Sequence, residues 1–224
     1  MNFLVIGSGA REHIIGEKIV ESGGDLYSVL TYRNPGLLKI SKNTVSVSDY
    51  SSTESKKIII DFAKTNDLEC VVIGPEDPLA NGFADMFMKT GISTVGPVSN
   101  LAQIETSKGF TRDLLSKYNI DCSPKYQRFT SLSGVREFLG LLSDNFVVKY
   151  DGLMGGKGVK VSGEHLHSHD EALTYCKHLI SKSGTFVVEE KIFGEEFSLM
   201  SFCDSFSHVS NQLNSAFVFA KSKL

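Results

Sequence analysis

Short apolar segments alternate with helical segments through the first 95 residues, and this rhythm constrains the fold more than any other feature. Four segments have the length and apolar character of buried strands: residues 3–6, 26–30, 70–73 and 93–95. Three segments repeat apolar side chains at helical spacing: residues 14–19, 52–65 and 80–88. Residues 33–36 read as a turn. Strands separated by helices of this length predict βαβ units and a parallel sheet.

The rhythm changes near Gly96-Pro97. Beyond it, helices are predicted at residues 107–118, 135–142 and 172–180. Strands are predicted at residues 125–129, 146–150, 159–161, 186–190 and 197–203. We therefore predict an α/β chain: a parallel-sheet, Rossmann-like domain over residues 1–100, an α+β domain over residues 101–204, and an atypical tail over residues 205–224.

Composition excludes several classes of protein. The net charge of −3 is too small to attract nucleic acid or an anionic membrane, so small-molecule partners are expected. The four cysteines are widely spaced, which argues against a zinc site or a disulfide framework. The N-terminus lacks the basic region of a signal peptide, and no segment approaches the ~18 apolar residues of a membrane span. We expect a cytoplasmic protein; its oligomeric state is not predicted.

The loop after the first strand is a candidate phosphate site. Its candidate residues are Gly7, Gly9, Arg11, Glu12 and His13. Glycines let the backbone approach a ligand, and the following helix offers free N–H groups. The dinucleotide fingerprint would need a third glycine and an acidic residue at the end of the second strand, and this sequence has neither. The sequence therefore favours a phosphate site over NAD; a tight turn without a ligand is the alternative.

A second loop, Gly74-Pro75-Glu76-Asp77, follows a buried strand. Loops at the carboxyl ends of parallel strands line the crevice where ligands bind. Two carboxylates there could bind an amine or ribose hydroxyls. An acidic surface turn that caps the next helix is the alternative, and this motif by itself favours it.

A glycine-dense loop joins two predicted strands over residues 149–158. The N–H groups of Gly155, Gly156 and Gly158 could fold over phosphates, while Lys149 and Lys157 supply positive charge. The loop does not match the GxxxxGK[ST] pattern, so we predict a hairpin flap and not a strand-to-helix cradle. A flexible surface hairpin is the alternative.

An apolar strand leads into a segment that suits adenine: Glu189, Lys191 and Ile192. Backbone groups there could form hydrogen bonds with the edge of adenine, and a later carboxylate could bind the ribose hydroxyls. An edge strand with a solvated charged turn is the alternative.

Lys108 lies in the first turn of a predicted helix, where a cation opposes the helix dipole. A bound anion would explain a lysine at this position. An ordinary surface lysine is the alternative.

Five motifs in this order resemble the phosphoribosylamine–glycine ligase family of the ATP-grasp superfamily. They are GSGAREH, VVIGPEDPLANG, GP followed by ETSKGFTRDLL, VVKYDGLMGGKGV and VVEEKIFGEEFSL, which together reach residue 204. The family usually has a second consecutive glycine where this chain has Ala10. The resemblance implies a pre-ATP-grasp domain followed by the first part of an ATP-grasp domain.

The resemblance also implies a reaction and a set of roles. Glycine would attack the γ-phosphate of ATP to give glycyl phosphate, and 5-phosphoribosylamine would displace phosphate to give glycinamide ribonucleotide. Lys108 and Lys149 would contact the ATP phosphates, as catalytic and nucleotide-binding residues, beneath the flap of residues 155–158. Glu189 and the backbone near Lys191 and Ile192 would hold adenine, and Glu196 would hold ribose. Residues 7–13 and 74–77 would bind 5-phosphoribosylamine and glycine.

Residues 205–224 do not resemble the family's continuation, which contains a GPNTGGMG run and, later, the residues that hold Mg²⁺. We therefore interpret the chain as truncated or as a fragment, with ATP binding weakened and turnover absent or very slow. Two alternatives stay open: a nucleotide-binding module without activity, and another ATP-grasp carboxylate–amine ligase. The final Ser222-Lys223-Leu224 matches a peroxisomal address, but so short a match is more readily a coincidence.

Overall fold

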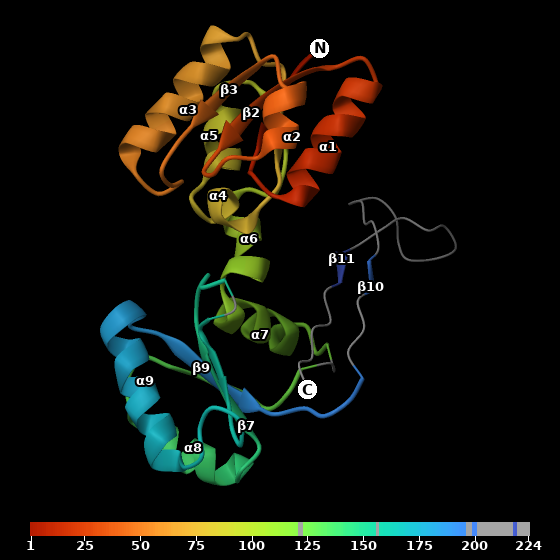
Figure 1. Ribbon diagram of the computed structural model, residues 1–224. Helices are drawn as coiled ribbons and strands as arrows, with labels where there is room; N and C mark the ends of the chain where they lie inside the picture. The colour runs from red at the N-terminus through yellow and green to blue at the C-terminus, as the bar shows by residue number, and fades with distance from the viewer. Residues whose placement is uncertain (121–122, 156, 196–198, 201–216, 219–224) are drawn as a thin grey trace. The chain divides into compact units, whose positions relative to one another are not determined.

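The computed structural model describes residues 1–120, 123–155, 157–195, 199–200 and 217–218. The chain divides into two compact units, Met1–Thr111 and Arg112–Leu224, which are described separately below. The α/β fold class is confirmed, with a parallel sheet in the first unit and an antiparallel sheet in the second (Figure 1). The domain bounds expected from the sequence stay a prediction.

The first unit is built on a five-stranded parallel sheet in the order β3-β2-β1-β4-β5. Its strands are β1 (Asn2–Ile6), β2 (Asp25–Leu30), β3 (Asn43–Ser46), β4 (Cys70–Ile73) and β5 (Ser93–Val95). Its helices are α1 (Ala10–Glu21), α2 (Pro35–Ile40), α3 (Thr53–Thr65), α4 (Glu76–Ala80), α5 (Phe83–Lys89) and α6 (Ser99–Thr106). The order places the ends of β1, β2 and β4 side by side, which positions the loops that follow them.

Alternation along the central strand gives this sheet two apolar faces. Leu4 and Ile6 of β1 belong to the buried cluster that includes α3 and α5, whereas Val5 belongs to the cluster that includes α1 and α2. Successive side chains of a strand point to opposite faces, so one apolar run supplies both. This is the pattern expected for a parallel sheet with helices on both sides.

The structure corrects three details of the predicted elements in this unit. Residues 33–36 begin a helix: the Asn34 side chain accepts hydrogen bonds from Gly36 and Leu37 N–H at 3.0 and 3.1 Å, and Pro35 occupies the first turn. The single helix predicted over residues 80–88 is two, α4 and α5, because Gly82 takes a left-handed conformation (φ +78°) between them. Strand β3 and helix α6 were not predicted, because neither has an apolar buried face: β3 has no buried residue, and Ala102 is the buried residue of α6.

The second unit contains a four-stranded antiparallel sheet in the order β6-β9-β7-β8. The strands are β6 (Tyr126–Phe129), β7 (Phe146–Tyr150), β8 (Val159–Val161) and β9 (Phe186–Glu190). The helices are α7 (Lys108–Lys117), which crosses the division between units, α8 (Val135–Leu142) and α9 (His169–Ser183). Residues Leu199–Met200 (β10) and Phe217–Val218 (β11) pair antiparallel; the rest of the strand predicted at residues 197–203 lies outside the described residues.

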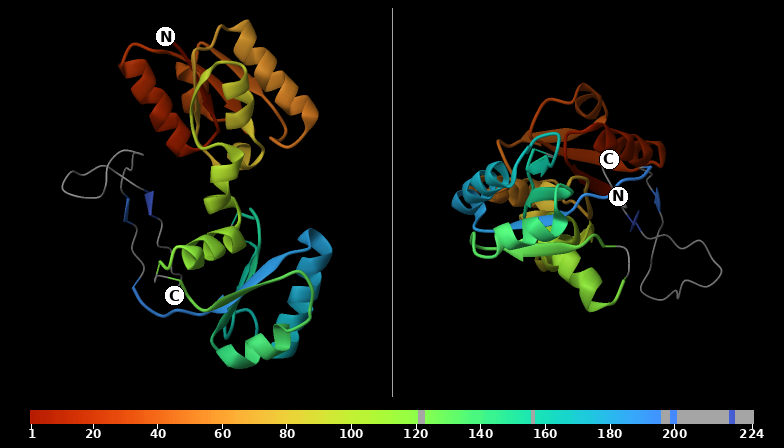
Figure 2. Two further views of the ribbon diagram at one scale, coloured as in Figure 1. Left: turned by 180° about the vertical axis from the view of Figure 1, so that it is seen from behind. Right: turned by 90° about the horizontal axis from the view of Figure 1, so that it is seen from below.

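One face of the antiparallel sheet is covered by α8 and α9, as Figures 1 and 2 show. Phe146 and Val148 of β7 and Phe186 and Val188 of β9 pack there against buried side chains such as Leu139. The intervening residues of both strands point to the opposite face. That second face carries the charged groups considered in the next subsection.

Helix α8 offers a matched test of this core. Leu139 is fully buried and Leu141, two residues on, is 78% exposed. We expect Leu139→Ala to lower the free energy of unfolding of the second unit by about 2–5 kcal/mol, because it leaves a cavity in the core. Leu141→Ala should change it by less than about 0.5 kcal/mol. Urea denaturation followed by circular dichroism measures both, and equal losses would contradict the assignment of the α8 core face.

Candidate functional site

Two of the predicted loops meet around one buried carboxylate at the carboxyl edge of the parallel sheet. Glu12, in the first turn of α1, is only 3% exposed, and its Oε2 accepts a hydrogen bond from Gly9 N–H at 2.7 Å. Its Oε1 is buried and has no hydrogen-bond partner among the described residues. The Glu12 side chain lies between the loop after β1 and the loop after β4.

The position of the Glu12 side chain explains why three neighbouring residues are glycines. A Cβ placed on Gly7, Gly9 or Gly74 would lie 2.5, 2.8 or 2.3 Å from the nearest atom of the Glu12 side chain, closer than real contacts permit. Gly7 also has a φ of +131°, which disfavours any residue with a side chain. Packing of Glu12 thus favours glycine at these three positions, and their contact with a ligand stays a prediction. Glu12 supports the loops from beneath, and its role in binding substrate stays a prediction.

Hydrogen bonds also join the loop after β1 to the loop after β2. The buried Ser8 hydroxyl accepts from Thr31 N–H at 2.8 Å, and Asn34 Nδ2 donates to the Ser8 carbonyl at 3.0 Å. His13 lies 3.3 Å from Glu17 one turn along α1, and Arg11 is exposed at the start of that helix. Ser8 and Asn34 were not singled out from the sequence; Asn34 directly before Pro35 is a helix-start signal that could have identified it.

Negative charge gathers at the same edge. Glu76 and Asp77 were expected in a loop, but they form the first turn of α4 after Pro75, where acidic side chains favour the helix dipole. Partial loss of water contact raises the pKa of Asp77, and the charges of Glu76 and Asp49 raise it further. Burial raises the pKa of Tyr50 to about 12, with the charges of Glu12 and Asp77 contributing. This edge of the first unit suits a cationic or hydroxyl-bearing ligand.

In the second unit, the face of the antiparallel sheet opposite α8 and α9 holds an ionic cluster. The carboxylate of Glu189 is 5% exposed; its Oε1 contacts Lys149 Nζ, and its Oε2 accepts a hydrogen bond from Arg112 Nε at 3.0 Å. Burial raises the pKa of Glu189, but the charges of Lys149 and Arg112 outweigh burial, and the net pKa lies below its ordinary value. The carboxylate therefore stays ionised at neutral pH.

Strand register creates this cluster. Glu189 of β9 pairs with Val147 of β7, and Lys149 lies two residues further along β7, so Lys149 and Glu189 share a face as diagonal neighbours. Arg112 reaches the same carboxylate from α7. Arg112 was missed in the sequence; its position four residues after Lys108 places both on one side of the predicted helix, which could have identified it.

The residues of the predicted flap lie in a hairpin loop between the antiparallel strands β7 and β8, and closure of this loop over phosphates stays a prediction. Tyr150 N–H donates to the Gly158 carbonyl at 2.7 Å where β7 and β8 diverge, and Gly155 has a left-handed φ of +54°. Lys157 is exposed on the loop, and Gly156 lies outside the described residues. Arg128 of β6 pairs with the buried Asp151 at 3.1 Å, which fixes the start of the loop.

At the predicted adenine-binding segment, Lys191 already forms hydrogen bonds within the protein. Lys191 N–H donates to the Asn145 carbonyl at 3.0 Å, and Lys191 Nζ contacts Ser162 and Glu164. Lys191 therefore ties the end of β9 to neighbouring loops, and adenine recognition would fall to Glu189 and the backbone near Ile192, which is 43% exposed. Glu196 lies outside the described residues, and Lys108 is the first residue of α7.

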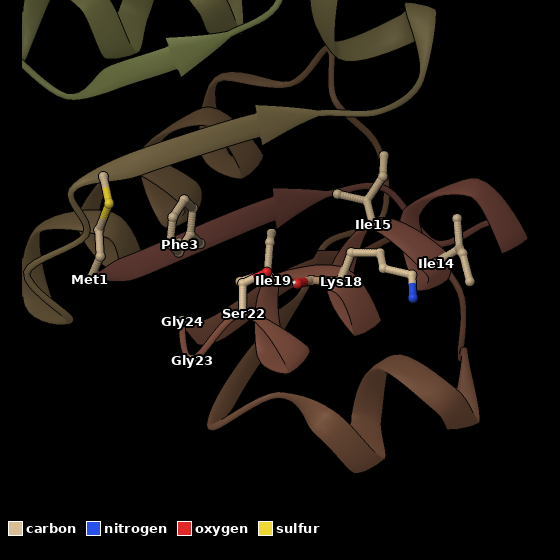
Figure 3. Close-up of a pocket in the computed structure, with 9 residues that line it drawn as sticks. All are labelled: Met1, Phe3, Ile14, Ile15, Lys18, Ile19, Ser22, Gly23 and Gly24. Atoms are coloured by element: carbon tan, nitrogen blue, oxygen red, sulfur yellow. Dashed lines mark hydrogen bonds between the residues drawn. The ribbon is translucent and has the colours of Figure 1, made fainter.

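Two open grooves hold none of the predicted site residues. One, of about 610 Å³ beside α1 and β1, is lined mainly by apolar side chains such as Phe3, Ile14 and Ile19 (Figure 3). The other, of about 680 Å³, includes Lys160 and Tyr175 on β8 and α9. In the part of the chain that the structure describes, no three His, Cys, Asp or Glu side chains gather as metal ligands, and no helix has the length and apolar character of a membrane crossing.

Comparison with known proteins places both units in one family. Residues 1–105 match the family described as phosphoribosylglycinamide synthetase, N domain, and residues 106–217 match the ATP-grasp (A) domain of the same synthetase. The second match extends beyond residue 204, where the resemblance noted in the sequence ended. The chain is 44% identical over 208 residues to a phosphoribosylamine–glycine ligase of Methanosphaera stadtmanae, which covers 91% of this chain and 46% of that protein. It is 37% identical over 206 residues to that of Pyrococcus horikoshii, with the same shares covered.

Solved structures share the fold. Phosphoribosylamine–glycine ligase from Thermotoga maritima matches with a TM-score of 0.66 and 24% identity, over 90% of this chain and 46% of that one. An N5-carboxyaminoimidazole synthetase from Staphylococcus aureus, complexed with ADP, matches with a TM-score of 0.66 and 12% identity, over 91% of this chain and 51% of that one. The chain thus spans about half the length of the relatives it matches.

The packing of Gly74 against Glu12 can be tested by a double-mutant cycle. We expect Gly74→Ala to lower the free energy of unfolding by about 1–3 kcal/mol, because the new methyl group overlaps the Glu12 side chain. Glu12→Ala should lose the hydrogen bond to Gly9 N–H, but in that background Gly74→Ala should cost clearly less. Urea denaturation of the four chains measures the coupling; strictly additive costs would show that Glu12 does not impose the glycine.

Proposed function

This chain belongs to the phosphoribosylglycinamide synthetase family, and we propose that it carries the ATP-binding part of a phosphoribosylamine–glycine ligase. The reaction would join glycine to 5-phosphoribosylamine and yield glycinamide ribonucleotide, ADP and phosphate, a step of purine biosynthesis. The observation that carries the proposal is the pairing of Lys149 with the buried Glu189 on the face of the antiparallel sheet opposite α8 and α9. A partly exposed cation beside a fixed carboxylate acceptor is suited to a nucleotide, because the cation can bind phosphate and the carboxylate can accept a hydrogen bond from the base.

On this proposal, the second unit binds ATP. Lys149 turns its ammonium toward the phosphates, where a charge-assisted contact is strongest, and the resemblance assigns Lys108 to the same phosphates. The 151–158 loop closes over them with its glycine N–H groups and Lys157. Glu189 and the backbone near Ile192 hold adenine, and Glu196 holds the ribose hydroxyls.

The loops of the first unit would bind the other substrates. Within residues 7–13, the first turn of α1 and the exposed Arg11 would bind the phosphate of 5-phosphoribosylamine, since the N–H groups of Gly7 and Gly9 already donate to Val29 and Glu12. Glu76 and Asp77 supply negative charge for its amine or its hydroxyls, in keeping with the charges that raise the pKa of Asp77. The protein's contribution is mainly to position these groups and to neutralise phosphate charge.

The chemistry balances without a protein nucleophile. A carboxylate oxygen of glycine attacks the γ-phosphorus of ATP, and the bond to ADP breaks. The amine of 5-phosphoribosylamine then attacks the acyl carbon of glycyl phosphate, an amide forms, and inorganic phosphate leaves with loss of a proton from the amine. Mg²⁺ is expected with ATP; the resemblance places the residues that would hold it in the part of the family that follows the segment matched here, and the ion would neutralise phosphate charge there. We place the protein in the cytoplasm.

Nucleotide binding can be tested with a matched pair of lysines. We expect Lys149→Met to weaken ATP binding about tenfold or more, because a charge-assisted contact to phosphate is lost. Lys160→Met removes the same charge from the neighbouring strand β8, but Lys160 lies over the Tyr175 ring on the other face of the sheet, so affinity should be unchanged. Isothermal titration calorimetry measures both; equal affinities for the two variants would refute an ATP site on this face.

Turnover separates the proposed ligase from the two alternatives. Very slow ADP release that requires both glycine and 5-phosphoribosylamine is the result expected of the ligase, since the chain spans about half the length of its relatives. ADP release with a different carboxylate–amine pair would identify another ATP-grasp ligase. ATP binding without ADP release under any pair would favour a nucleotide-binding module. A coupled ADP assay on the 224-residue chain, with each substrate omitted in turn, gives the answer.

A further inference from the structure

The Glu189 carboxylate contacts two cationic side chains, which come from different elements and differ in conformational flexibility. Lys149 reaches it on a flexible four-carbon stem from the neighbouring strand, whereas Arg112 reaches it from α7 with a planar guanidinium. The Lys149 and Arg112 side chains are each 22% exposed, so both keep some access to water or to a ligand. The resemblance assigns no role to Arg112 in the proposed reaction.

Other charged and titratable groups surround this pair. Tyr126 of β6 stands directly opposite Glu189 in the strand pairing, and its hydroxyl lies 3.0 Å from the carboxylate of Asp113. Asp113 follows Arg112 in α7 and is exposed. Arg128, two residues after Tyr126 in β6, forms an ion pair with Asp151. Within the described residues, the cations that contact the Glu189 carboxylate are therefore Lys149 and Arg112.

The proposed function makes conflicting demands on Lys149. Its ammonium neutralises Glu189 in the structure, yet the same ammonium would have to turn toward the ATP phosphates. A buried carboxylate that loses its only cation is costly and tends to take up a proton. Arg112 removes this conflict, because its hydrogen bond is to Oε2 and can persist while Oε1 is released.

Resting on the proposed function, we propose that Arg112 is a positioning residue that holds Glu189 as an ionised acceptor for the exocyclic amino group of adenine while Lys149 turns to the phosphates. An ionised carboxylate only accepts hydrogen bonds, so it favours the amino group of ATP over the carbonyl of ITP. A protonated carboxyl can donate to that carbonyl. Arg112 thereby contributes to the choice of base without touching the nucleotide.

The first test follows the Glu189 carboxyl directly and needs no nucleotide. In chains labelled with ¹³C at the glutamate side chain, the Glu189 signal is titrated by NMR and assigned with Glu189→Gln. We expect Glu189 to titrate at higher pH in Arg112→Met than in the unmodified chain, because one of its two cations is gone. Arg112→Lys, which keeps the charge, should restore most of the difference.

The second test compares ATP with ITP by calorimetry. The unmodified chain should bind ATP at least about tenfold more tightly than ITP, the effect of one hydrogen bond to a charged group. Arg112→Met should reduce this ratio toward one, and the reduction should grow as pH falls through the range in which Glu189 titrates. A purely structural role for Arg112 would weaken both nucleotides equally and leave the ratio intact.

Arg136→Met is the matched control. Arg136 pairs with Asp170 on the surface of the same unit, and its side chain is 61% exposed, so its loss removes the same charge away from Glu189. It should leave the Glu189 titration and the ATP-to-ITP ratio unchanged. If Arg112→Met left the titration of Glu189 unchanged, or left the ratio of ATP to ITP affinity unchanged, the inference about Arg112 would be overturned while the proposed function would stand. An unmodified folded chain that binds neither nucleotide would overturn the proposed function and this inference with it.

Discussion

Burying the carboxylate of Glu189 costs several kcal/mol of folding free energy unless cations lie beside it. In the second unit, Lys149 and Arg112 provide these cations. The observed register of β9 against β7 meets this requirement, because it places Lys149 diagonal to Glu189 on the same face of the sheet. Arg112 comes to this face from α7. The charge on one face and the apolar packing of α8 and α9 on the other are therefore set by the same strand pairing.

A second buried carboxylate organises the first unit in a different way. Glu12 forms no ion pair within the described residues; its carboxylate accepts a hydrogen bond from Gly9 N–H, and its side chain occupies space that glycines leave open. Gly7 and Gly74 come from loops far apart in the sequence, yet both are shaped by one side chain of α1. Sequence reasoning assigned these glycines to ligand approach, and the structure adds an internal reason for them.

Periodicity revealed the elements that carry a clear apolar pattern and missed those that do not. Apart from β3, the strands of the two larger sheets were predicted, and so were the helices α3, α8 and α9, because apolar side chains recur in each at the spacing of its element. The six residues of α2 and the four of β3 offer too few repeats, and only the Asn34-Pro35 start of α2 carried a local signal. The loops of the candidate site were predicted by their glycines and charges. Arg112 was not, since its role arises from a contact with Glu189 that is 77 residues away in sequence.

The alternation within β9 has a consequence for how this strand can change over time. Val188 packs under α8 and α9, and Glu189, the next residue, faces the cations. Substitutions can be absorbed one position at a time, but inserting or deleting a single residue would move every later side chain to the other face. A carboxylate would enter the apolar core and a valine would stand before two cations. Length variation among descendants of this chain should therefore fall in its loops, while β9 keeps its length even where its residues diverge.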